Sequence, residues 1–349
     1  MEEDQGEEEI ASVLARQKDL MRLDSAVRFP GPQPTALSRH ALHKDVKSGR
    51  REYWLSEKID GVRKQVFMTR YNTKPVAYAL DRKGCMSLVY YDYFHPALFD
   101  GTVLDAEFSN DKFVVFDCPV FCGQAISHRD YGVRLKYARD AVRACFPSPQ
   151  CADSAGAPGL AEFEFERDLW HPDCVFEVKP MFLLKDAKRF CEKYMTRADP
   201  RHRCDGVILN PVPDAMYCGK HPFLFKFKET KDHTCDFRVR LKNAPAEVSF
   251  CPIAQPGNLY LYFLGESGRE ELYTSIRYDD VRIDGDPGPG DGEIWECALD
   301  AESRWLPIRQ RSDKKDPNAK STVLETLQCI ADQLTLRELY EEPCLPRAF

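Results

Sequence analysis

The chain has 349 residues, 43% of them hydrophobic, and a formal net charge of −7. This length allows two domains with substantial cores, and the acidic balance argues against a protein that coats nucleic acid non-specifically, although it can still hold a basic cleft. The 14 cysteines are widely spaced without a CxxC pair, the start is acidic, and no apolar run reaches the ~20 residues of a membrane span, so we expect no zinc site, disulfide framework, secretory signal or membrane segment.

The first elements lead to a proline-rich segment. Residues 8–23 carry apolar side chains at helical spacing and predict a peripheral helix. The segment Phe29-Pro30-Gly31-Pro32-Gln33-Pro34 follows, and its three prolines fix an extended path that does not suit a central strand. Taken alone, such a segment is most often a linker.

The stretch from Lys58 to Arg63 reads Lys-x-Asp-Gly-x-Arg, with Asp60 and Gly61 at its centre. Strand-like runs flank it, so Lys58 is expected where a strand meets a tight turn. A lysine attacks phosphorus only as the free amine, and a neighbouring cation such as Arg63 disfavours the ammonium form. The pattern therefore makes Lys58 a candidate nucleophile that forms a lysyl phosphoramidate.

Further strands carry charged and aromatic candidates. Arg82 lies on a predicted hairpin turn between strands at 75–80 and 86–90. The strand at 102–108 places Asp105 and Glu107 on one face, and the apolar strand at 113–117 contains Phe116. A helix is predicted at 130–145 and a surface insertion at 147–158. Paired carboxylates on a strand are more often a solvated face than a site.

The next segments add lysines and another carboxylate. Glu177 and Lys179 share one face of a strand at 175–179, and a helix is predicted near 185–195. The pair Asp205-Gly206 leads into a strand, and strict alternation at 223–228 projects Lys226 and Lys228 from one side. Each pattern also has a plain structural interpretation, as turn chemistry or as an edge strand with solvated lysines.

From residue 242 onward, short strands separated by turns predict a small antiparallel barrel or sandwich. Asp316-Pro317 suits the start of a final helix with an apolar stripe. The predicted elements of this part are strands at 259–264, 272–276 and 294–299, a Gly/Pro/Asp loop at 285–292 and a helix after Pro317. The resulting domain boundaries are 1–240, 241–318 and 319–349, the last being a C-terminal helix that packs back on the first domain.

The joint order of these patterns favours nucleotidyl transfer. Glu107 and Asp205 are candidate ligands for Mg²⁺ or Mn²⁺, which also binds substrate phosphates, because such ions are usually held by one or two carboxylates. Lys226 and Lys228 are candidates to stabilise the α-phosphate, and Phe116 to stack on the base.

In this order the motifs resemble those of the covalent nucleotidyltransferase superfamily, which comprises polynucleotide ligases and messenger-RNA capping guanylyltransferases. Two flanking stretches resemble the capping branch. The first is Phe29 to Pro34, similar to a Phe-Pro-Gly-x-Gln-Pro signature. The second is the stretch 304–314, which ends in Arg309-Gln310-Arg311-Ser312-Asp313-Lys314 and has Pro317-Asn318 downstream, similar to the Arg-x-Arg-x-Asp-Lys motif VI of capping enzymes.

The resemblance implies an α+β fold, with an antiparallel-sheet nucleotidyltransferase domain of ATP-grasp-like ligase type and a C-terminal OB-fold β-barrel. It implies that GMP passes from GTP through Lys58 to the diphosphate 5′ end of RNA. Motif positions make Lys58, Arg63, Glu107, Lys226 and Lys228 catalytic. They assign GTP contacts to Asp60, Gly61, Arg82, Phe116, Lys179, Asp205, Asp236, Arg309, Asp313 and Lys314.

One position departs from the family pattern, one assignment has an alternative, and the resemblance also implies partners. Ala106 stands where capping enzymes usually have glycine, and Phe121 is an alternative to Phe116. Candidate partners are an RNA triphosphatase, a cap methyltransferase and the C-terminal tail of RNA polymerase II, in the nucleus, or in the cytoplasm for a viral or cytoplasmic form. The alternatives are an ATP-dependent ligase and a catalytically inactive binding module that keeps the fold.

Overall fold

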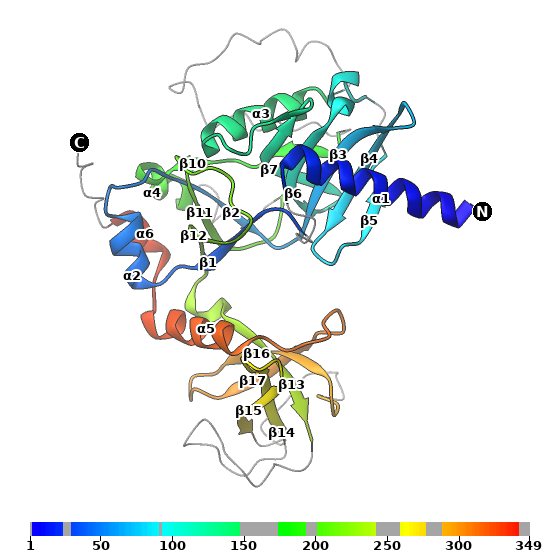
Figure 1. Ribbon diagram of the computed structural model, residues 1–349. Coiled ribbons are helices and arrows are strands. Elements are labelled where there is room, and N and C mark those ends of the chain that lie inside the picture. Colours follow the sequence, from blue (N-terminus) through cyan, green and yellow to red (C-terminus); the bar gives the residue numbers. More distant parts are fainter. Residues whose placement is uncertain are drawn as a thin grey trace. The chain divides into compact units, whose positions relative to one another are not determined.

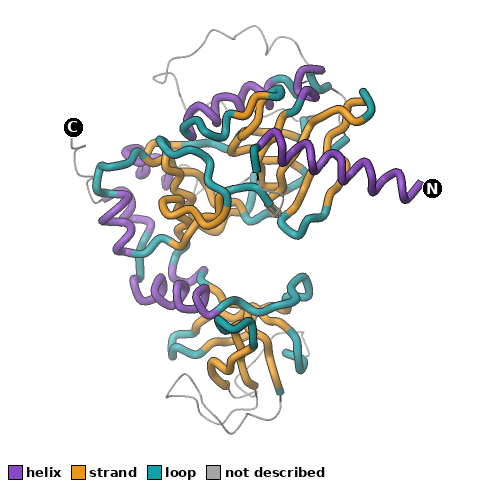
Figure 2. Tube along the Cα trace, viewed as in Figure 1, coloured by secondary structure: helices purple, strands orange, loops and turns teal. Residues whose placement is uncertain are grey.

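The structure is a computed structural model that describes residues 2–23, 29–90, 93–146, 174–192, 201–241, 259–276 and 288–341. Backbone contacts divide the chain into two compact units (Figures 1 and 2). The first unit comprises Met1–Thr35, Ala41–Phe227 and Arg337–Phe349, and the second comprises Ala36–His40 and Lys228–Leu336. Each unit is described by itself below.

The larger sheet of the first unit has seven strands, in the order β5-β4-β3-β6-β7-β8, with β9 paired to β7. All its pairs are antiparallel except β7 with β9, which is parallel. The strands are β3 (Val62–Tyr71), β4 (Lys74–Asp81), β5 (Met86–Leu88), β6 (Thr102–Ser109), β7 (Lys112–Phe121), β8 (Gln124–Ala125) and β9 (Phe176–Val178).

The smaller sheet of the first unit follows the order β1-β12-β11-β2-β10. The proline-rich strand β1 lies at its edge, where missing amide donors cost least. The strands are β1 (Pro32–Ala36), β2 (Tyr53–Ile59), β10 (Phe182–Leu183), β11 (Cys204–Pro211) and β12 (Gly219–Phe227). Lys58 is the penultimate residue of β2, directly before the Asp60-Gly61 turn.

Two helices cover opposite faces of the larger sheet. On one face, α3 (Tyr131–Arg143), capped by the Asp130 side chain, packs Leu135 and Ala138 into the main core. On the other face, α1 (Glu2–Met21) buries Val13 and Met21 in a smaller cluster with Phe67. The predicted N-terminal helix is present and lies on the outer face of the sheet, where it covers this cluster (Figure 1).

Short helical segments complete the first unit. They are α2 (Arg39–Ala41) and α6 (Leu336–Glu341), each of which begins in the second unit, a π-helical turn at Leu42–Val46, 3-10 turns at Pro96–Asp100 and Leu184–Asp186, and α4 (Ala187–Phe190). Lys47 Nζ donates to the Leu339 carbonyl at 2.6 Å, which ties α6 to the segment before β2.

The second unit holds a five-stranded antiparallel sheet in the order β15-β14-β13-β16-β17. Its helix α5 (Lys320–Asp332) places Val323 in the same core as Phe237 and Phe263. The strands are β13 (Thr234–Arg240), β14 (Leu259–Leu264), β15 (Glu270–Ile276), β16 (Ile294–Leu299) and β17 (Trp305–Gln310), with a 3-10 turn at Thr230–Asp232.

The α+β architecture built on antiparallel sheets is confirmed. Between the edge strands β15 and β17, no pairing that would close a barrel is present in the part of the chain that the structure describes. β13 belongs to the second unit, because it pairs with β14 and β16.

Three further predictions concern the last helix, two loops and membrane segments. Helix α5 starts at Lys320, after Ala319, and so begins later than Asp316-Pro317 suggested. The predicted insertion at 147–158 and the part of the loop at 285–287 lie outside the described residues. Across the described ranges, no helix has the length and apolarity needed to cross a membrane.

Candidate active site

Lys58 lies beside an acidic residue on the neighbouring strand. Its Nζ contacts Asp205 Oδ1, and both side chains are about one-fifth exposed, 22% and 23%. Asp205 and Gly206 sit in a β-bulge of β11, since Cys204 pairs with Ile59 and Val207 with Glu57. Lys58 therefore faces the two bulge residues, and the Asp205 carboxylate contacts its amino group.

Gly61 brings the turn after Lys58 onto the larger sheet. A Cβ at this position would meet the Phe108 carbonyl at 2.6 Å and Glu107 Cγ at 2.9 Å. Only glycine allows so close an approach. The Asp-Gly of the motif thus sets Lys58 near Glu107, while Asp60 lies exposed at the turn and its amide donates to the Arg203 carbonyl.

Arg63 is buried and fully engaged with protein groups. Its Nε and one terminal nitrogen donate to the two Asp105 oxygens at 2.9 and 2.6 Å, and the other terminal nitrogen donates to the Pro32 carbonyl. Its guanidinium carbon lies 5.3 Å from the Phe29 ring centroid and 5.4 Å from that of Phe116. A bidentate pair of this kind is a rigid anchor.

Glu107 and Lys179 form the buried charged part of the site. Burial raises the pKa of Glu107, and Lys179, Arg63, Arg82 and Lys58 oppose that shift. Burial likewise lowers the pKa of Lys179, which is only 6% exposed, while Glu107 and Glu57 oppose it. Desolvation therefore outweighs pairing at both groups, so each gains from a ligand of opposite charge.

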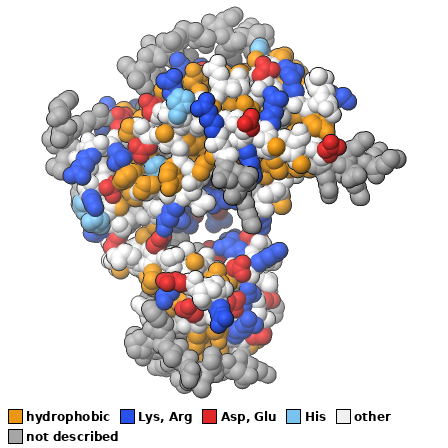
Figure 3. All heavy atoms as spheres, in the orientation of Figure 1, with side chains coloured by type: hydrophobic (Ala, Val, Ile, Leu, Met, Phe, Trp, Pro, Cys, Tyr) orange, Lys and Arg blue, Asp and Glu red, His pale blue; other side chains and the backbone are white. Residues whose placement is uncertain are grey.

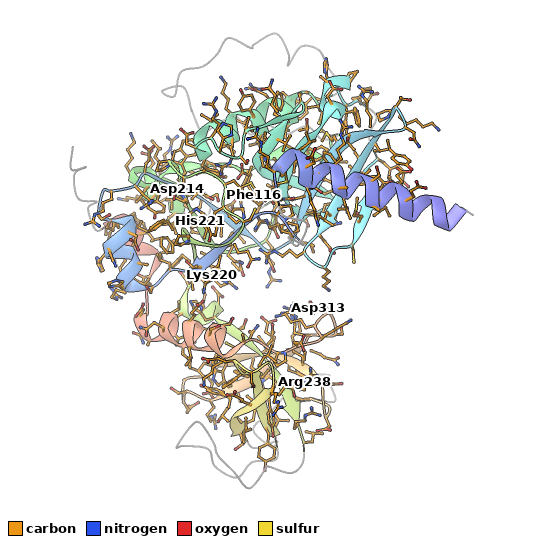
Figure 4. All side chains as sticks on the ribbon, in the orientation of Figure 1. Phe116, Asp214, Lys220, His221, Arg238 and Asp313 are labelled. Atoms are coloured by element: carbon orange, nitrogen blue, oxygen red, sulfur yellow. The ribbon has the colours of Figure 1, made fainter. Side chains whose placement is uncertain are left out.

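Phe116 lies next to this charged cluster. Lys179 Nζ is 5.4 Å from the ring centroid of Phe116, which is labelled in Figure 4, and Tyr131 of α3 donates to the Phe116 carbonyl at 2.8 Å. Phe121 instead packs against Tyr137 of α3, with ring centroids 5.1 Å apart. The surroundings of Phe116, and not those of Phe121, include the charged residues of the site.

The remaining candidates of the first unit lie on a turn and on β12. Arg82 is on the exposed turn between β4 and β5, where partial desolvation of its guanidinium and the nearby Arg63 charge lower its pKa. Lys226 is partly exposed on β12, opposite Ile208 of β11. Lys228 follows the end of β12 and already belongs to the second unit.

The other four candidates of the second unit belong to one ion-pair network, which Arg311 joins by lying 3.2 Å from Asp236 and 3.9 Å from Glu296. Lys314 Nζ contacts Asp236 of β13, a residue 5% exposed. Asp313 receives two hydrogen bonds from Arg311, at 2.9 and 3.0 Å (Figure 4). Arg309 pairs with Glu296 instead. Figure 3 shows acidic and basic side chains intermixed on the visible face of this unit.

Sequence reasoning did not assign three residues that organise these groups. Arg311 contacts Asp236 at 3.2 Å as well as Asp313 and so joins the motif VI residues. Asp105 holds Arg63, and Gln65 lies buried beside that pair. The alternation that placed Asp105 on the face of Glu107, and the Arg-x-Arg pattern, were the available signals.

Two family models match the chain. One, described as "mRNA capping enzyme, catalytic domain", matches residues 3–230, and the other, "mRNA capping enzyme, C-terminal domain", matches residues 232–340. The mRNA-capping enzyme subunit alpha of Schizosaccharomyces pombe is 27% identical to this chain, in an alignment that covers 100% of this chain and 90% of that protein. Its Neurospora crassa namesake is 25% identical, covering 95% of this chain and 86% of that protein.

Solved structures give weaker likenesses. The ATP-dependent DNA ligase from bacteriophage T7 in complex with ATP is 13% identical, with a TM-score of 0.38, over 81% of this chain and 98% of that one. A Lig E DNA ligase is 14% identical, with a TM-score of 0.34, over 80% of this chain and 99% of that one.

Proposed function

Because this chain belongs to the mRNA capping enzyme family, we propose that it is a GTP:mRNA guanylyltransferase that works through a covalent Lys58–GMP intermediate. The observation that carries the proposal is the contact between Lys58 and Asp205 beside Glu107 and Lys179. A potential nucleophile, a proton acceptor and a cation that lie close together support this proposal.

In the first step Lys58 Nζ attacks the α-phosphorus of GTP. The new N–P bond forms as the bond from the α-phosphorus to the bridging oxygen breaks, and pyrophosphate leaves. Lys58 must lose a proton, and the Asp205 carboxylate is its nearest acceptor. Lys226 and Lys228, with Arg309 and Lys314 of the second unit, are the proposed cations for the phosphates.

In the second step a terminal β-phosphate oxygen of an RNA 5′ diphosphate attacks the same phosphorus. The N–P bond breaks, the nitrogen regains a proton, and a 5′–5′ triphosphate linkage results. Phe116 is proposed to stack on the guanine and Lys179 to contact its edge, while Arg82 contacts the ribose and Asp60, Gly61, Asp236 and Asp313 shape the remaining contacts.

A divalent ion fits the donor set only together with substrate phosphates. Within the described ranges, no group of three or more His, Cys, Asp or Glu side chains is arranged to hold a metal. Glu107 and Asp205 would supply one or two carboxylates to Mg²⁺ or Mn²⁺, the usual share when phosphates provide the rest. Such an ion, when bound, would offset charge on the leaving pyrophosphate.

The proposal is tested by incubating the protein with radiolabelled GTP or ATP and Mg²⁺, then separating it on a denaturing gel. We expect label from GTP and not ATP, none in Lys58→Ala, and native labelling in Lys231→Ala, a control at a largely exposed lysine. Label from ATP would indicate a ligase, and no label from either would indicate a binding module. Label retained by Lys58→Ala would refute the lysine assignment.

The same proposal sets the cellular context. We propose that the protein acts in the nucleus, or in the cytoplasm if viral or part of a cytoplasmic capping system. An RNA triphosphatase would supply the diphosphate end and a cap methyltransferase would act on the product. The C-terminal tail of RNA polymerase II is the proposed recruiting partner.

A further inference from the structure

One face of the larger sheet is shared between a helix and the candidate site. Alternation along β3 directs Arg63, Gln65 and Phe67 to the same face. Phe67 lies in the cluster under α1, whereas Arg63 belongs to the site. Gln65 stands between the two and is completely buried. Gln65 therefore lies where the region covered by α1 ends and the candidate site begins.

A continuous chain of hydrogen bonds crosses this boundary. Gln17 of α1, 2% exposed, donates from Nε2 to Gln65 Oε1 at 3.1 Å. Gln65 Nε2 in turn donates to the Pro30 carbonyl and, at 3.4 Å, to Asp105 Oδ2. Asp105 accepts hydrogen bonds from Arg63, so the series of hydrogen bonds runs from α1 to Arg63 in the candidate site.

The two acceptors determine the direction of these hydrogen bonds. The Pro30 carbonyl and the Asp105 carboxylate accept hydrogen bonds and cannot donate, so the Gln65 amide must turn its NH₂ toward them. Its oxygen then faces α1 and requires a donor there. Gln17 meets that requirement, whereas an apolar residue would leave a buried oxygen without a partner, which is unfavourable.

The segment held by Gln65 rests directly on the Arg63–Asp105 pair. A Cβ on Gly31 would meet an Arg63 terminal nitrogen at 2.5 Å and Asp105 Oδ2 at 3.0 Å. Pro32 accepts a hydrogen bond from Arg63, and the Phe29 ring lies over the same guanidinium. A shift of Pro30 would therefore move groups that line the site.

We propose that Gln17 is a positioning residue for nucleotide binding. Through the Gln65 amide it fixes Phe29 to Pro32 and the Arg63–Asp105 pair, and so shapes the wall that receives the nucleoside triphosphate. The N-terminal helix is then a functional part of the site as well as a cover for the sheet. This inference rests on the function proposed above.

The test compares Gln17→Met, Gln65→Met, the double variant and Ser12→Ala, a control at an exposed position of the same helix. The rate of Lys58–GMP formation is measured against GTP concentration, together with thermal unfolding. We expect Gln17→Met to raise the half-saturating GTP concentration about tenfold, as for one lost buried hydrogen bond, with a change of less than about threefold in the maximal rate. The double variant should match Gln65→Met.

Other results would overturn the inference. A lower melting temperature with an unchanged half-saturating GTP concentration would assign Gln17 to stability alone. If the increases of the two single variants in half-saturating GTP concentration multiply in the double variant, Gln17 does not act through Gln65. Should the Gln17 variant not fold, Gly31→Ala approaches the same pair from the other side and must also raise the half-saturating concentration. Wild-type protein that forms no adduct would refute the proposed function instead.

Discussion

The contact between Lys58 and Asp205 imposes a condition on the chemistry at the residue scale. The Asp205 carboxylate lies against the Lys58 amino group, so it is placed to take the proton that this group must lose before it attacks phosphorus. The sequence suggested instead that neighbouring cations activate Lys58. The bulge at Asp205 places an anion there, and residue spacing does not reveal a bulge.

The first residue-scale prediction concerns Asp205. Asp205→Asn keeps the size of the side chain but removes the proton acceptor, so we expect adduct formation to slow about 100-fold, within the usual contribution of a general base. The loss should shrink as pH rises, because solvent can then take the proton. Quenched-flow labelling across pH measures this, with Asp214→Asn as the matched control. An unchanged rate at neutral pH would contradict the assignment.

The second residue-scale prediction concerns the buried Glu107. Because burial raises its pKa, its contribution to stability is present below the unfolded-state value and is lost as pH rises through the raised folded-state value. Glu107→Gln removes that loss. We therefore expect the variant to melt higher than wild type at neutral pH and equally near pH 4, while adduct formation falls about 100-fold. Calorimetry at several pH values checks the sign.

At the scale of elements, α3 is tied to the strand that carries Phe116. Arg134 donates to both Asp117 oxygens, at 2.9 and 3.1 Å, and to the Asp214 carbonyl at 3.1 Å; Asp214 and His221 lie close together in Figure 4. Both charged side chains are almost fully buried, 4% and 3% exposed. The pair therefore fixes β7 against α3 and the loop before β12.

This tie gives an element-scale prediction. Arg134→Met leaves Asp117 charged and buried and should cost about 3–5 kcal/mol in the free energy of unfolding. Adding Asp117→Leu removes the unpaired charge and should restore most of that stability. Urea denaturation measures both variants. If the double variant is no more stable than the single one, the burial of an unpaired charge is not the cause.

Sequence reasoning predicted elements better than their junctions. The alternation in β6 and β12 and the apolar run of β7 fixed those strands, because burial on one or both faces leaves a periodic pattern. The contact between α1 and β3 was not predicted because Gln17 is polar and its partner, Gln65, lies 48 residues away in sequence. The start of α5 was misplaced because Ala319 gives no capping signal.

At the scale of the whole molecule, the candidate residues divide between two units that are each organised internally. Lys58, Glu107 and Lys179 belong to the first unit, and the motif VI cations are held by Asp236 and Glu296 within the second. If the second unit serves only the step that expels pyrophosphate, a substitution in it should slow Lys58–GMP formation and leave the transfer of GMP to RNA unchanged. A defect confined to one half-reaction is the signature of such a division.

Lys314→Ala provides the test of that division. It removes a cation held by the buried Asp236, so we expect Lys58–GMP formation to slow about 100-fold, the scale of losing one charge-stabilising group. Adduct that accumulates slowly in the variant can be isolated and mixed with diphosphate-ended RNA, and its GMP should then transfer at nearly the native rate. Arg304→Ala, at an exposed arginine that pairs with Asp300, is the control and should leave both steps unchanged. Equal slowing of both steps would mean that the second unit contributes to RNA capping throughout, because the same cation would then be needed when no pyrophosphate is present.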